Sequence, residues 1–207
     1  MQTLLHLKTS LFSDNGQSSQ LAARYVAQWR AANPQGRVIE RDLARDPVPH
    51  LTAERFGAFL AKAEDRTPEQ QAAAGYSDAL VAELQAADTI VLGLPLYNFG
   101  VPSTLKAYFD HVARAGLTFR YSEKGPVGLL VGKRALVFAA RGGLHVGTPR
   151  DTQTGFVRDF LNFLGIADVE FVYAEGLAMG EAPKAEALAQ AHRAIEALSA
   201  GRIAQAA

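Results

Sequence analysis

The residues that point most directly to chemistry lie in an aromatic loop near the middle of the chain. The apolar run Thr89–Leu94 is typical of a buried strand, and the loop Leu96-Tyr97-Asn98-Phe99-Gly100 follows it, before a helix expected to open at Pro102. Open parallel sheets bind ligands beyond the carboxyl ends of their strands. An apolar loop whose amide side chain can donate and accept suits a flat aromatic cofactor, with flavin as the first candidate. The alternative is a hydrophobic loop that only packs on the core.

A second candidate loop is rich in hydroxyl groups and follows the first apolar run. Unpaired backbone amides and the helix dipole favour an anion at a helix N-terminus. The side chains suited to hold a phosphate there are Ser10, Gln17, Ser18 and Ser19, with Gly16 permitting a tight turn. The alternative is that Ser18 only caps the helix. Neither G-x-x-x-x-G-K-[ST] nor G-x-G-x-x-G occurs, which argues against the common triphosphate and dinucleotide loops.

A third loop, Ala139-Ala140-Arg141-Gly142-Gly143-Leu144-His145, follows the fourth apolar run. Paired glycines let backbone amides approach a ligand, and N–H donors at one edge of an isoalloxazine ring can stabilise negative charge. Taken alone, the loop is more typical of a plain turn than of a ligand site. Arg141 either offsets charge near the ligand or lies on the surface, and His145 either reaches the pocket or faces solvent. Because all three loops should follow strands ending at one edge, their convergence predicts a single site.

The elements that must position these loops alternate between apolar runs and segments of helical period. Such alternation predicts a doubly wound α/β fold, a five-stranded parallel sheet with helices on both faces. Thr67-Pro68-Glu69-Gln70 predicts a helix start with a capping box. The expected strands are Thr3–Leu7, Val38–Arg41, Thr89–Leu94, Ala135–Ala140 and Val169–Tyr173.

Two segments depart from this alternation, although 207 residues fit one domain spanning 1–207. Asp46–Arg66 is expected to be a long connection with a short helix over Thr52–Ala63. Leu117–Lys133 is expected to form a hairpin or lid, because it contains alternation and a Gly-Pro turn. The helix Gly155–Leu164 is apolar on more than one face, which fits either the core alone or the core together with a subunit interface.

Composition narrows the class of function. Lys and Arg total 21, as do Asp and Glu, so net charge gives no reason to expect nucleic acid or a membrane as a partner. The chain has no cysteine, and its histidines lack ligand spacing, so we expect no metal site. The N-terminal apolar run is too short for an export signal, and we expect a cytoplasmic protein.

Several motifs together resemble the FMN-dependent NADH azoreductases, also described as FMN-dependent NADH:quinone oxidoreductases. They are P-L-Y-N-F-G-V-P-S, A-R-A-G-L-T-F-R-Y, R-G-G and F-L-G-I, and the similarity runs essentially end to end. The resemblance implies a flavodoxin-like fold and a homodimer with one FMN per subunit near the interface. It also implies that NADH passes a hydride to flavin N5 and leaves before a quinone or azo compound is reduced, a ping-pong cycle.

The resemblance assigns residues to this site by position. The phosphate end falls on Ser10, Gly16, Gln17 and Ser18, and the ring lies against Leu96, Tyr97, Asn98, Phe99, Ala140, Arg141, Gly142 and Gly143. Tyr121 and Phe163, with Phe119 nearby, are expected to wall the substrate pocket. The family often has serine where Gly16 and Ala140 stand and methionine where Leu96 stands. Each lost hydroxyl puts in doubt one side-chain contact, worth about 0.5–1.5 kcal/mol.

A cofactor that carries the hydride leaves positioning and electrostatics to the protein, so no catalytic acid or base is expected. Tyr121 is a hypothetical proton source for the second substrate. The sequence does not separate NADH from NADPH, or quinones from azo compounds. A flavodoxin-like electron carrier is the alternative function, but such carriers need a charged docking face, and this chain is neutral. A third interpretation is an α/β domain that has lost its cofactor.

Overall fold

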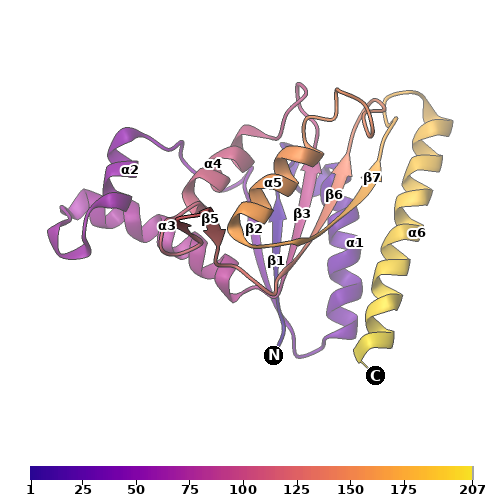
Figure 1. Cartoon of the computed structure of the whole chain (residues 1–207). Helices are drawn as coiled ribbons and strands as arrows, with labels where there is room; N and C mark the ends of the chain where they lie inside the picture. Colours follow the sequence, from indigo (N-terminus) through magenta and orange to yellow (C-terminus); the bar gives the residue numbers. More distant parts are fainter. Residues whose placement is uncertain (207) are drawn as a thin grey trace.

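A five-stranded parallel sheet forms the middle of the protein (Figure 1). The computed structural model describes residues 1–206, with side chains as far as Ala200. The strand order is β2-β1-β3-β6-β7, and every neighbouring pair is parallel. The doubly wound α/β prediction is therefore confirmed. The strands are β1 (Thr3–Lys8), β2 (Arg37–Asp42), β3 (Thr89–Pro95), β6 (Arg134–Ala140) and β7 (Asp168–Ala174).

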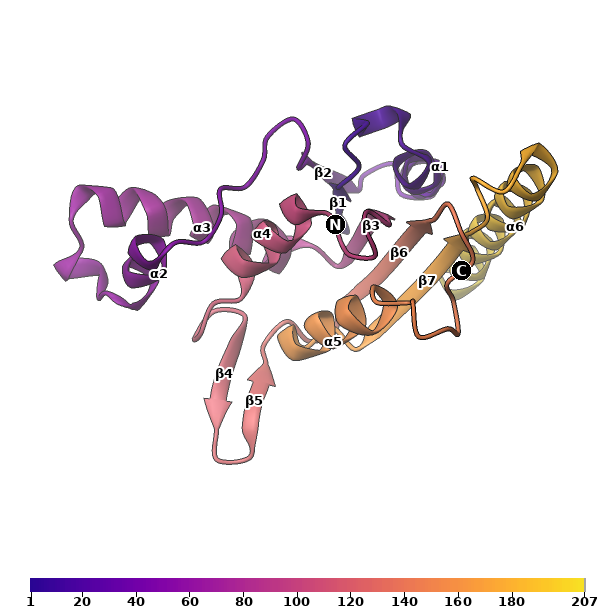
Figure 2. The same ribbon diagram turned by 90° about the horizontal axis from the view of Figure 1, so that it is seen from above.

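Helices cover both faces of this sheet, as Figure 2 shows from above. One face carries α1 and α6, and the other carries α3, α4 and α5. Successive strand residues point to opposite faces, so Leu4 packs with α1 while Leu5 belongs to the core beneath α3 and α4. The helices are α1 (Gln17–Ala32), α2 (Ala53–Leu60), α3 (Pro68–Ala86), α4 (Ser103–Val112), α5 (Thr154–Leu164) and α6 (Glu181–Ala206), with short 3-10 turns η1 (Ser13–Asn15) and η2 (Ala63–Asp65).

Helix starts follow the local sequence signals. The capping box before α3 is present: Thr67 Oγ1 accepts from the Gln70 backbone N–H at 3.3 Å, and Gln70 Oε1 accepts from the Thr67 N–H at 3.1 Å. Thr52 caps α2, which lies within the expected short helix. Among the residues that the structure describes, no helix is both long enough and apolar enough to cross a membrane.

A two-stranded antiparallel hairpin interrupts the alternation between α4 and β6. Its strands are β4 (Phe119–Ser122) and β5 (Gly125–Gly128). Figure 2 shows the hairpin projecting from the body of the protein beside α5. Its base is tied to the end of that helix, because the Leu130 N–H donates to the Leu164 carbonyl at 2.8 Å.

Burial of His6 in β1 makes the fold sensitive to acid. Its side chain is 1% exposed, and burial lowers its pKa from 6.5 to about 4, although Glu40, 3.5 Å away, opposes the shift. Between pH 6.5 and pH 4 the unfolded chain therefore binds a proton that the folded chain does not, so stability is lost as the pH falls through this window. We expect His6 to account for about 3 kcal/mol of lost stability by pH 4.

Urea unfolding of the wild type and of His6→Gln at pH 7.0, 5.5 and 4.5 measures this effect. The variant should lose less stability than the wild type as the pH is lowered. Equal losses in the two proteins would show that His6 is not the group responsible.

Candidate functional site

The three candidate loops meet at the carboxyl edge of the sheet. They follow β1, β3 and β6, which are adjacent in the strand order. The Tyr97 hydroxyl lies 3.2 Å from Ser10 Oγ and accepts from the Leu11 backbone N–H at 3.2 Å. The Leu96 N–H donates to the Ala140 carbonyl at 3.2 Å. The middle loop therefore contacts the loop on either side of it.

The loop after β1 presents hydroxyl groups that the protein itself does not use. Ser18 and Ser19 are buried, and their Oγ atoms have no hydrogen-bond partner among the described residues. Gly16 is the N-cap of α1 and makes no side-chain cap, so the alternative in which Ser18 only caps the helix is wrong. Orphaned hydroxyls next to the first amides of α1 are the donor set that a phosphate needs. This end of the site fits the phosphate of FMN.

Gly16 and Gly93 let this loop pack closely. A β-carbon at Gly16 would lie 2.1 Å from Ser10 Oγ, so the Ser10 hydroxyl occupies the space of a side chain at position 16. A β-carbon at Gly93 would lie 3.1 Å from the Ser18 carbonyl oxygen. The glycines therefore bring the Ser10 side chain and the N-terminus of α1 close to the end of β3.

Lys8 holds the same loop against β2. Its ammonium group lies 2.7 Å from Asp14 Oδ1 and 2.6 Å from Glu40 Oε1. Its hydrogen bonds lower the pKa of both carboxyl groups. The lysine charge is thus used within the protein, and the hydroxyl and amide donors are what remain for an anion.

The aromatic loop after β3 has a strained backbone. Asn98 and Phe99 have φ angles of 49° and 61°, in the left-handed region that costs about 1–2 kcal/mol per residue outside glycine. The Gly100 N–H donates to the Tyr97 carbonyl at 2.9 Å, which closes the turn. Asn98 is exposed, and no described residue pairs with its amide. The turn therefore presents Asn98 and Phe99 outward at the edge of the sheet.

The loop after β6 is held to the segment that follows β7 by hydrogen bonds to its carbonyl groups. The carbonyls of Arg141, Gly142 and Gly143 accept from backbone N–H groups of the segment 176–178 at 3.0–3.1 Å. The N–H groups of Gly142 and Gly143 have no acceptor among the described residues. Free amides at this edge are suited to donate to a polar ring edge, as an isoalloxazine ring presents.

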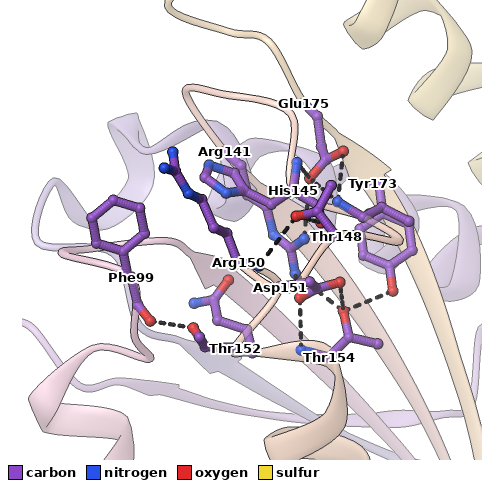
Figure 3. A network of polar contacts seen from close by, with 12 residues as sticks. Phe99, Arg141, His145, Thr148, Arg150, Asp151, Thr152, Thr154, Tyr173 and Glu175 are labelled. Atoms are coloured by element: carbon purple, nitrogen blue, oxygen red, sulfur yellow. Dashed lines mark hydrogen bonds and ion pairs between the residues drawn. The ribbon is translucent and has the colours of Figure 1, made fainter.

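Arg141 is the centre of a buried network behind this loop (Figure 3). Its side chain is 0% exposed, and its guanidinium lies 2.9 Å from Asp151 Oδ1 and 3.1 Å from Glu175 Oε1. It also donates to Thr154 Oγ1 at 3.1 Å and lies over the Tyr173 ring. The surface alternative for Arg141 is therefore wrong, and its charge is used by carboxylates of the protein.

Glu175 extends the network into the loop itself. Its Oε1 accepts from the backbone N–H groups of His145 at 2.9 Å and Val146 at 3.1 Å. The His145 ring stands edge-on to Phe99, with centroids 6.1 Å apart (Figure 3). His145 therefore joins the second loop to the third. The described residues contain no group of side chains able to hold a metal ion.

The predicted pocket residues Phe119, Tyr121 and Phe163 form a cluster of their own. The Phe119 ring lies 5.4 Å from Tyr121 and 4.5 Å from Phe163, between centroids. Phe163 is near the C-terminal end of α5, about 14 Å along the helix from Thr154 at ~1.5 Å per residue. The hairpin projects beside that helix end (Figure 2). The structure thus brings these three residues together, but not over the three loops of the same chain.

Sequence reasoning missed Asp151, Gln153 and Glu175, which hold the second and third loops. Polar residues are common in turns, and these three lie in turns or far from the loops in sequence, so nothing in the local sequence marked them as supports of the site. The short run Asp151-Thr152-Gln153-Thr154 before α5 was the available signal, because such residues favour helix starts.

Comparisons with known proteins identify the family to which the chain belongs. Residues 2–198 match a family described by its flavodoxin-like fold. An FMN-dependent NADH:quinone oxidoreductase of Cellvibrio japonicus is 59% identical over 196 residues, which cover 95% of this chain and 98% of that protein. A protein of the same name from Alcanivorax borkumensis is 55% identical over 188 residues, or 91% and 95% of the two chains.

Solved structures place the chain in the same group. An azoreductase of Bacillus anthracis superposes with a TM-score of 0.88 at 27% identity, covering 96% of this chain and 99% of that one. An FMN-dependent NADH-azoreductase of Bacillus anthracis, solved in complex with FMN, gives 0.88 at 27% identity, covering 97% and 98%. The chain therefore belongs to the FMN-dependent NADH:quinone oxidoreductases, a family of enzymes with the flavodoxin-like fold.

Proposed function

We propose that this protein binds FMN at the three loops and uses NADH to reduce quinones and aromatic azo compounds, cleaving the latter to amines. The proposal is supported chiefly by hydrogen-bond donors that have no acceptor among the described residues and that lie at both ends of the candidate site, along the carboxyl edge of the sheet. At one end are the Ser18 and Ser19 hydroxyls, and at the other are the Gly142 and Gly143 amides. The names and FMN content of the relatives support the same cofactor and donor.

Each loop has a separate task in this proposal. Ser10, Gln17 and Ser18, with the first amides of α1, bind the phosphate, and Leu96, Tyr97 and Phe99 pack against the ring. Asn98 and the amides at Gly142 and Gly143 hydrogen-bond the polar edge of the ring, where donors stabilise added negative charge. When bound, FMN supplies a carrier that takes a hydride from NADH and delivers it to the second substrate in a ping-pong cycle.

A homodimer completes the site in this proposal. Tyr121 is 76% exposed on the projecting hairpin, and Phe156, on the outer side of α5, is 37% exposed. A second subunit would cover these aromatic groups and bring the cluster Phe119–Tyr121–Phe163 to the site of its partner. Flat quinones and azo compounds would then stack between the flavin and aromatic side chains.

The phosphate assignment predicts a selective loss. Ser18→Ala removes one buried hydroxyl, and a hydrogen bond to a charged group is worth about 1.5–3 kcal/mol, or roughly ten- to a hundredfold in affinity. FMN should therefore bind that much more weakly, whereas riboflavin, which lacks the phosphate, should bind as it does to the wild type. Flavin fluorescence titration of the apoprotein measures both affinities.

Ser199→Ala is the matched control, because Ser199 bonds Gln28 on the α1–α6 side and should leave both affinities unchanged. If Ser18→Ala weakened FMN and riboflavin binding equally, the assignment of Ser18 to the phosphate would be wrong.

The activity itself is tested with purified protein, FMN and no partner protein. Steady-state rates with NADH and NADPH against a panel of quinones and azo dyes should show NADH oxidation and parallel double-reciprocal lines. Azo dyes should yield the two amines. If NADH is oxidised only after a partner protein is added, the electron-carrier function is correct instead.

A further inference from the structure

The strained turn of the aromatic loop requires support from outside the loop. Asn98 and Phe99 are consecutive residues in the left-handed region. Such conformations persist only where the surrounding structure over-determines them. The closing bonds between Tyr97 and Gly100, at 2.9 and 3.3 Å, join residues within the loop and do not fix it to the protein.

Gln153 supplies the external support. Its side chain is fully buried, and its amide nitrogen donates to the Pro95 carbonyl at 2.8 Å and to the Gly100 carbonyl at 2.9 Å. Both partners are acceptors, so the amide has to present its NH2 group to them. The two carbonyls lie at the entrance and the exit of the loop, and one side chain therefore clamps both ends.

The same turn also holds the middle of the loop. Thr152 Oγ1 donates to the Phe99 carbonyl, on the residue with the larger positive φ (Figure 3). Asp151, one residue earlier, forms an ion pair with the guanidinium of Arg141, which belongs to the third loop. The turn before α5 therefore contacts both loops that would flank the ring, whereas within the part of the chain that the structure describes its side chains make no hydrogen bond or ion pair with the phosphate loop.

We propose that Gln153, assisted by Thr152, is a positioning residue for the isoalloxazine end of the FMN site. This inference rests on the proposed function. Gln153 acts through the backbone of residues 95–100: it holds Asn98 and Phe99 in the conformation that meets the ring. Loss of the clamp should loosen ring binding and leave phosphate binding intact.

Gln153→Met keeps the length of the side chain and removes both donors. We expect the affinities for FMN and riboflavin to fall together by at least about tenfold, with their ratio unchanged, because the ring end is common to both ligands. Gln153→Glu should be worse at pH 7, since a carboxylate would face two carbonyls, and should recover in part as the pH is lowered and the carboxyl group gains a proton. Thr152→Val, an exposed substitution that should not impair folding, should give a smaller loss of the same kind.

Ser77→Ala is the matched control for a merely structural effect. It breaks buried bonds to the His111 carbonyl and the Arg114 guanidinium between α3 and α4, remote from the loops. It should lower the melting temperature and leave both flavin affinities unchanged at 20 °C.

Three results overturn the inference. They are unchanged flavin affinities in both Gln153→Met and Thr152→Val, a loss confined to FMN, or an equal loss in Ser77→Ala. If the wild type binds FMN normally in these cases, the proposed function stands and only the role of Gln153 is wrong. If the wild type binds neither FMN nor riboflavin, the proposed function itself fails, and the inference fails with it.

Discussion

Arg141→Met is expected to destabilise the protein by about 3–5 kcal/mol, as is typical when one partner of a buried ion pair is removed. The side chains of Asp151 and Glu175 are 10% and 14% exposed, and both would keep a charge without its counterion. The pKa of Asp151, held low by hydrogen bonds from Thr154 and Arg141 despite partial burial, should rise. Because Glu175 also accepts from the His145 and Val146 amides, the third loop should loosen, and flavin binding should weaken as well.

Urea unfolding at pH 7 measures the loss of stability. Arg134→Met is the control, since its ion pairs with Asp168 and Glu170 are more exposed and should cost less than ~1 kcal/mol. Adding Asp151→Asn to Arg141→Met should restore part of the stability, because it removes one stranded charge. A loss no larger than that of Arg134→Met would contradict the role assigned to the network.

Gly128→Ala is the second substitution expected to have a large effect. A β-carbon at position 128 would lie 2.0 Å from the Gly165 backbone nitrogen and 2.3 Å from the Leu164 carbonyl carbon. These are backbone atoms and cannot rotate away, so the hairpin has to separate from the end of α5. Overpacking costs about 1–3 kcal/mol, occasionally more, and we expect the upper end of that range. The contact between Phe119 and Phe163, 4.5 Å between centroids, should be disturbed at the same time.

The control reverses the sign of the effect. Gly75 lies within α3 with open space around the position of its β-carbon, so Gly75→Ala should stabilise the protein by up to about 1 kcal/mol. Thermal unfolding of the two variants should therefore move the melting temperature in opposite directions. If Gly128→Ala melts with the wild type, the close approach of the hairpin to α5 is not required for folding.

Hydrophobic period and turn chemistry were sufficient to predict the frame of this fold. Each predicted strand lies within an observed one, and the boundaries differ by one residue at most at either end. Strands buried on both faces are continuous apolar runs, which are easy to recognise. Ends of elements were predictable where one side chain decides them, as Thr67 does for α3.

The internal supports of the site were not predictable. Arg141 forms its ion pairs with residues 10 and 34 positions away, and Gln153 clamps a loop more than 50 positions earlier. Such pairs depend on how α5 and β7 pack in three dimensions, and no local pattern records that. An arginine beside two glycines looks like a surface or ligand contact until the carboxylates facing it are known.

The position of the three residues predicted to wall the substrate pocket could not be predicted either. Phe119, Tyr121 and Phe163 are aromatic, as a pocket for flat substrates requires, and the structure groups them. Their position beside the far end of α5 depends on how the hairpin docks, through the close contact of Gly128 with Gly165. Period and composition contain no information about the direction in which a hairpin projects.

The proposed function requires that this protein, with FMN bound at the three loops, passes reducing equivalents from NADH to a quinone without another protein. Anaerobic titration of the purified FMN-bound protein tests it most directly. One equivalent of NADH per FMN should bleach the flavin absorbance near the visible maximum, and one equivalent of a benzoquinone should restore it. A flavin that stays oxidised in excess NADH, or stays reduced until a partner protein is added, would contradict the claim.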